Sequence, residues 1–81
     1  KEVIQMAPKA FILIETAVGK AKEVATSLGQ INGLKSVDMV TGPYDIITTI
    51  EAETLNNIGD MVTGKIHAID GISRTVTCLV V

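Results

Sequence analysis

The hydrophobic and polar positions of the chain follow one plan twice: a short apolar run, a segment with helical periodicity, then another strand-like run. Residues 10–15 (AFILIE) form a short run rich in β-forming residues and predict a strand. Residues 18–31 place Val24, Leu28 and Ile31 at helical spacing with charged residues between them, which predicts an amphipathic helix. Residues 34–41 alternate like a half-buried strand.

The second half repeats this order after a turn. Pro43 cannot donate a hydrogen bond to a ladder, so Gly42–Pro43 is the expected hairpin turn before a third strand at residues 45–52. Thr54 is a suitable N-cap for a second helix of about four turns. The apolar positions that predict this helix are Leu55, Ile58, Val62, Ile66 and Ile69. The last strand is expected at residues 72–81.

Short internal repeats support this division. ILIE recurs as TTIE 36 residues later, and INGL recurs as IDGI 38 residues later, each with a glycine that can end a helix in the left-handed conformation. Two right-handed β-α-β crossovers joined by a hairpin predict an α+β, ferredoxin-like βαββαβ fold. Its four-stranded antiparallel sheet would carry both helices on one face, in the strand order fourth, first, third, second.

The first strand is apolar on both of its faces, because Ala10, Ile12 and Ile14 alternate with Phe11 and Leu13. Helices can cover only one of these faces, and 47% of the 81 residues are hydrophobic, which is more than one small core can bury. A homodimer packed sheet to sheet is therefore expected.

The length allows one domain, placed at residues 10–81, after an N-terminal extension at residues 1–9. Two interpretations of the extension remain open: Met6 is the natural start, or Val3 and Ile4 extend a strand.

Composition excludes several function classes. The net charge is −2 and only 2% of the residues are aromatic, so neither a basic stripe nor a base-stacking platform is available for direct nucleic-acid binding. The apolar runs are too short to span a membrane. The single cysteine, Cys78, cannot form an intrachain disulfide, and a cytoplasmic location is expected. Cys78 lies in an apolar strand and is expected to be buried.

Two candidate binding sites are rejected from the sequence. GDMVTGKI, residues 59–66, resembles a phosphate-binding loop, but Ile66 stands where a hydroxyl should hold magnesium, and the segment continues a helical pattern. His67 is the only histidine and has no nearby cysteine or second histidine, so a metal site is not expected. It is expected to be a solvated residue at a helix end.

Glu15 and Glu51 hold equivalent positions in the two halves, at the ends of the central strands. An acid–base pair is conceivable, but solubilising edge charges are the favoured interpretation. No cofactor and no enzymatic activity are expected.

The residues VTGPYDIITTIEA, followed by a helix and IDGISRTVTCLVV, resemble the ligand-binding domain of the Lrp/AsnC regulators, also called the RAM module. The resemblance runs from about Ala10 to Val81, and its most specific parts are the G-x-Y-D hairpin and the G-[IV]-x-R-T-x-T pattern. Family members carry a helix-turn-helix domain before this module. Here about nine residues stand in its place, which suggests a stand-alone or excised module without direct operator binding.

The resemblance implies a function in transcriptional regulation of amino-acid metabolism. It implies sheet-to-sheet dimers, octameric or decameric rings, co-assembly with full-length regulators, and an amino-acid effector bound near the G-x-Y-D loop. The residues expected to bind the effector are Gly42, Tyr44, Asp45, Thr75 and Thr77.

Asp45 has two interpretations. It can cap the Gly42–Pro43 turn, or it can pair with the ammonium group of an effector whose carboxylate meets amides around Gly42. Thr75 and Thr77 share one face of the last strand and can supply hydroxyls, or simply reflect β-propensity. Two rival functions remain open: a small enzyme of the dimeric ferredoxin-like barrel type, and a purely structural assembly domain.

Overall fold

A computed structural model of the chain describes residues 7–81. The strands are β1 (Lys9–Thr16), β2 (Leu34–Met39), β3 (Ile46–Glu51) and β4 (Ile72–Leu79). The helices are α1 (Ala21–Gly29) and α2 (Leu55–Met61), the latter continued by a π-helical turn, η1 (Val62–Ile66). Every strand and helix expected from the sequence is present. Val3 and Ile4, the expected strand extension, lie outside the described residues.

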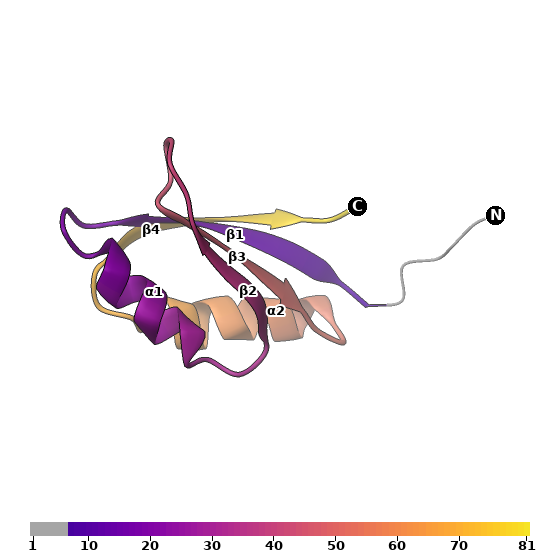
Figure 1. Cartoon of the computed structure of the whole chain (residues 1–81). Helices are drawn as coiled ribbons and strands as arrows, with labels where there is room; N and C mark the ends of the chain where they lie inside the picture. Colours follow the sequence, from indigo (N-terminus) through magenta and orange to yellow (C-terminus); the bar gives the residue numbers. More distant parts are fainter. Residues whose placement is uncertain (1–6) are drawn as a thin grey trace.

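The four strands form one antiparallel sheet in the order β2-β3-β1-β4. This confirms the predicted ferredoxin-like topology and places β1 and β3 at the centre. Both helices lie on the same side of the sheet, and the β2–β3 hairpin extends to the other side (Figure 1). β2 and β4 are the two edges.

The alternation in β1 divides the apolar residues between the two faces. Ala10, Ile12 and Ile14 are fully buried beneath the helices, whereas Phe11 is 39% exposed and Leu13 is half-buried. The helices complete the core on their side. Their buried side chains are Val24, Leu28, Ile58, Val62 and Ile66.

The side of the sheet away from the helices is called the open face here. Register places Thr49 and Cys78 beside Phe11 on this face, and Ile47 and Val76 beside Leu13. The centre of the open face therefore consists of Phe11, Leu13, Ile47, Thr49, Val76 and Cys78. This centre is largely apolar.

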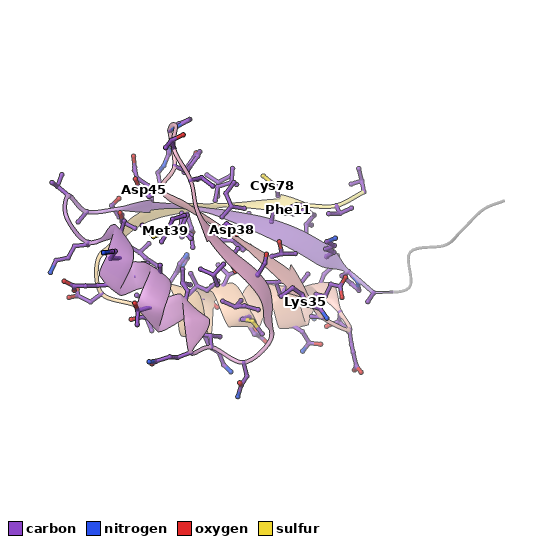
Figure 2. All side chains as sticks on the ribbon, viewed as in Figure 1. Phe11, Lys35, Asp38, Met39, Asp45 and Cys78 are labelled. Atoms are coloured by element: carbon purple, nitrogen blue, oxygen red, sulfur yellow. The ribbon has the colours of Figure 1, made fainter. Side chains whose placement is uncertain are left out.

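The exposure of Cys78 differs from the expectation. This residue was predicted to be buried, but the structure exposes it. The reason is its position: Cys78 pairs with Phe11 on an edge strand and points away from the helices (Figure 2). An apolar strand does not reveal which of its faces the helices cover.

The second helix differs from a regular α-helix. Thr54 caps it as predicted, since its hydroxyl oxygen accepts a hydrogen bond from the backbone N–H of Asn57 at 3.0 Å. The α-helical turns end at Met61, and the N–H of His67 then donates to the carbonyl of Val62, five residues earlier. The residues of the apparent phosphate-binding motif lie within this helical segment, so the prediction that they continue a helix is confirmed.

Candidate functional site

The Asp45 carboxylate connects the hairpin to the central strand. Its Oδ2 accepts a hydrogen bond from the backbone N–H of Thr16 at 2.8 Å and one from the Thr16 hydroxyl at 3.0 Å. The backbone N–H of Asp45 donates to the carbonyl of Ile14 at 2.9 Å. Of the two interpretations of Asp45, the turn cap named the wrong partner, because the backbone N–H that donates to its carboxylate belongs to Thr16 at the end of β1.

The hairpin itself is closed by the backbone. The N–H of Val40 donates to the carbonyl of Asp45 at 2.8 Å. Gly42 has φ +118°, in the region that favours glycine, and a Cβ at this position would meet no atom within 4 Å. Backbone conformation, and not crowding, accounts for the glycine at the tip.

Tyr44 ties the hairpin to the edge strand β4. Its hydroxyl oxygen accepts a hydrogen bond from Arg74 Nη2 at 2.7 Å, and the guanidinium carbon lies 5.4 Å from the centre of the tyrosine ring. Arg74 Nε also lies 3.9 Å from Glu15 Oε1. Tyr44 and Glu15 thus meet the same guanidinium at one end of the sheet.

Glu51 lies at the other end of the sheet, because it pairs with Lys9 while Ile14 pairs with Ile46. Its carboxylate is 3.6 Å from Lys35 Nζ. The two glutamates are therefore separate surface charges, as favoured from the sequence, and do not form an acid–base pair.

Thr75 and Thr77 do share one face of β4, as predicted. Thr75 pairs with Ile14 and Thr77 with Ile12, so both point to the helix side. The hydroxyl of Thr75 lies 2.8 Å from Nε2 of His67. His67 is exposed at the end of η1, as expected, but its ring has a protein partner that the sequence did not indicate.

Two of the five predicted binding residues, Asp45 and Thr75, line different hollows. Asp45 lines a hollow of about 390 Å³ beside the β1–α1 loop and Met39. Thr75 lines another of about 340 Å³, together with His67 and Arg74 at the β4 edge. Tyr44 and Gly42 belong to the hairpin between them. One chain does not bring all five residues to a single pocket.

Sequence reasoning missed three participants in these contacts: Thr16, Arg74 and His67. For Thr16 and His67, the contact depends on strand register or on how the helix ends, and neither leaves a motif. For Arg74 a signal was available, because it is the arginine of the G-[IV]-x-R-T-x-T pattern. Within residues 7–81, no cluster of three potential metal ligands occurs, and none of their helices is long and apolar enough to cross a membrane.

A ferredoxin-like domain with an apolar open face and a G-x-Y-D hairpin tied to both β1 and β4 has the features of a regulatory ligand-binding module. Residues 9–81 match the family model described as the Lrp/AsnC ligand binding domain. The chain belongs to this family, whose members include transcription regulators.

Two comparisons show the breadth of the relationship. The transcriptional regulator FL11 of Pyrococcus furiosus is 42% identical over 65 residues, which is 76% of this chain and 42% of FL11. The crystal structure of FFRP-DM1 superposes with a TM-score of 0.85 at 35% identity, covering 91% of this chain and 99% of that one. The chain spans about half or less of the length of the curated regulators that it matches. For example, it covers 51% of another Pyrococcus furiosus regulator.

More distant structures share the fold. A Neisseria meningitidis transcriptional regulator, solved as a complex with L-Met, has a TM-score of 0.82 at 17% identity and covers 100% of this chain, which spans 57% of the regulator. At this identity the comparison supports the fold alone.

Proposed function

We propose that this chain is an amino-acid-binding and assembly module that acts in the regulation of transcription, and that it is not an enzyme. Its effector binds at the hairpin, and its open face forms the contact between subunits. Residues 9–81 contribute sensing and assembly, while DNA binding belongs to the helix-turn-helix domains of the regulators in its assemblies.

The observation that carries the proposal is the state of the Asp45 carboxylate. Oδ2 receives both hydrogen bonds from Thr16, whereas Oδ1 receives none from residues 7–81. A carboxylate held in place with one oxygen available suits a ligand ammonium, because charge-assisted hydrogen bonds are about twice as strong as neutral ones. The amides around Gly42 are the predicted partners of the ligand's carboxylate. The Neisseria meningitidis regulator of the same fold is a precedent for an amino-acid ligand.

The separation of the two hollows supports a site shared between subunits. Thr75 and Thr77 lie on the helix side of β4, away from the Asp45 hollow of the same chain. We place these hydroxyls against a ligand held by Asp45 of a neighbouring copy, because neither threonine lines the Asp45 hollow of its own chain. Sheet-to-sheet dimers that join into octamers or decamers would create such contacts between dimers.

The rival enzyme reading has weak support in the geometry. A barrel-type enzyme needs a base in a lined cavity, but the centre of the open face consists of apolar side chains with one threonine and one cysteine. Tyr44 contacts Arg74, and His67 contacts Thr75 on the helix side of the sheet. Each candidate base therefore already has a hydrogen-bonding partner among the protein side chains.

Thermal stability measured with each of the twenty amino acids tests the proposal against a purely structural domain. A ligand at one hundred times its dissociation constant adds about 2.7 kcal/mol to the free energy of unfolding, which is a readily measured increase in Tm. Calorimetric titration with the stabilising amino acid then gives the affinity. If no amino acid raises Tm at millimolar concentration, the sensing role is wrong.

The proposal also predicts that the isolated chain does not bind duplex DNA at physiological salt. Its net charge is −2, and its seven basic residues are dispersed, so few phosphate contacts can form. Fluorescence anisotropy with a labelled operator fragment should show no binding at micromolar protein. A salt-sensitive, sequence-dependent signal would contradict the division of labour proposed here.

A further inference from the structure

The hollow beside Asp45 contains more than the hairpin residues. It is lined by Thr16 at the end of β1, by residues 17–19 of the β1–α1 loop, by Ala21 and Lys22 of α1, by Met39 at the end of β2, and by Asp45. Asp45 and Met39 lie at the same end of the sheet, above the first turn of α1 (Figure 2). Its volume of about 390 Å³ falls within the usual range for small-molecule sites. Gly42 is not among the lining residues.

Two opposite charges line this hollow without pairing with each other. Asp45 directs its two hydrogen bonds through Oδ2 to Thr16. Lys22 is exposed and forms no ion pair within residues 7–81, unlike its neighbour Lys20, whose Nζ lies 3.7 Å from Glu23. A free α-amino acid carries both charges at one end, so its ammonium and carboxylate groups complement this arrangement.

The remaining walls are largely apolar. Met39 is 52% exposed and Val18 is fully exposed, although both are large hydrophobic residues. Ala17 and Ala21 add small apolar surfaces. An aliphatic side chain placed against Met39 and Val18 would remove apolar surface from water on both molecules.

We propose that Lys22 binds the α-carboxylate of the effector, in place of the amides around Gly42, and that Met39 and Val18 select an aliphatic side chain. This inference rests on the proposed amino-acid function. It assigns the carboxylate contact and the side-chain selectivity to α1, β2 and the β1–α1 loop, outside the G-x-Y-D hairpin.

The carboxylate contact is tested with L-leucine and L-leucinamide, which differ in that charge. The native chain should bind L-leucine more tightly than L-leucinamide in calorimetric titrations. Lys22→Gln should weaken L-leucine binding up to about fivefold, the upper range for an exposed charge pair, and leave L-leucinamide unchanged. Lys65→Gln, in a hollow on the other helix, is the matched control and should change neither affinity.

Selectivity is tested with L-leucine and L-glutamine. Met39→Gln should reduce the preference for L-leucine roughly tenfold, because an apolar contact becomes polar. Leu55→Gln is the control, since Leu55 is similarly exposed at 59% but lies outside this hollow. The inference would be overturned if Lys22→Gln left the ratio of L-leucine to L-leucinamide affinity unchanged and Met39→Gln left the ratio of L-leucine to L-glutamine affinity unchanged. The proposed function would still stand. A native chain that binds no amino acid would overturn both.

Discussion

At the scale of single residues, Asp45 has a structural role that its position before an apolar run only partly indicates. It joins the hairpin to the end of β1 through two hydrogen bonds to Thr16. Hydrogen bonds to charged groups contribute about 1.5 to 3 kcal/mol, and Asp45 is only half-buried. We therefore expect Asp45→Ala to lower the free energy of unfolding by about 1 to 3 kcal/mol in urea titrations.

Milder variants separate this structural role from ligand binding. Thr16→Val removes the hydroxyl but keeps the backbone N–H and the Asp45 charge, so it should cost about 1 kcal/mol and reduce ligand affinity far less than the loss of that charge. Asp45→Asn keeps an acceptor for Thr16 but loses the charge, so it should remain folded and lose most amino-acid affinity. If the amino-acid affinity of Asp45→Asn were unchanged, the carboxylate would have a structural role alone.

Tyr44 provides a second residue-scale prediction. Tyr44→Phe keeps the aromatic ring over which Arg74 lies and removes only the hydroxyl that accepts its hydrogen bond. We expect a loss of about 0.5 to 1 kcal/mol and faster amide hydrogen exchange at the hairpin residues, because one of its ties to β4 is gone. Exchange at the centre of β1 should be unchanged. Protection of the hairpin equal to that of the native chain would show that Arg74 does not restrain it.

Residue-scale contacts were the least predictable part of the molecule. A carboxylate ahead of an apolar run drew attention to Asp45, yet its partner lies 29 residues earlier in the chain. Finding Thr16 requires the register of β1 against β3, which periodicity does not give. The prediction that Cys78 is buried was wrong for a related reason. Burial depends on which face of β4 the helices cover, and the sequence does not show this.

At the scale of elements, the sequence was sufficient for order, type and topology. The apolar run of β-forming residues in β1 and the helical spacing in α1 and α2 are strong signals, and the paired glycines mark where each helical segment gives way to a strand. Gly33 and Gly71 have φ +103° and +101°, as their repeated setting predicted. The π-helical turn η1 was not predictable, because the apolar spacing of its buried residues also fits a regular α-helix.

Gly71 allows a test of this reading. Alanine there would meet a positive φ, and its Cβ would lie 3.0 Å from Val24 Cγ2 in the core. We expect Gly71→Ala to cost about 1 to 2 kcal/mol from the backbone alone, measured by urea unfolding. Gly59→Ala is the control: this helical glycine has nothing within 4 Å of an added Cβ, so alanine should stabilise by about 0.5 to 1 kcal/mol. Equal effects at both positions would contradict the conformational argument.

At the scale of the whole molecule, the sheet leaves an apolar surface that one chain cannot cover. The helices occupy one side, and Phe11 stands with Cys78 on the other (Figure 2). The two-sided apolar pattern of β1 predicted this division from the sequence. What it could not predict is the arrangement of copies, because a single chain does not specify its neighbours.

The open face leads to the last prediction. Because Phe11 lies at the middle of this face and is 39% exposed, a second copy packed sheet to sheet would bury it on both subunits. The native chain should be at least a dimer by light scattering at micromolar concentration. Phe11→Asp should give monomers, since each interface would have to desolvate two carboxylates. Leu55→Asp places the same charge on an exposed residue of α2 and should leave the dimer intact. A native chain that is monomeric, or a Phe11→Asp variant that remains dimeric, would show that the open face is not where subunits meet.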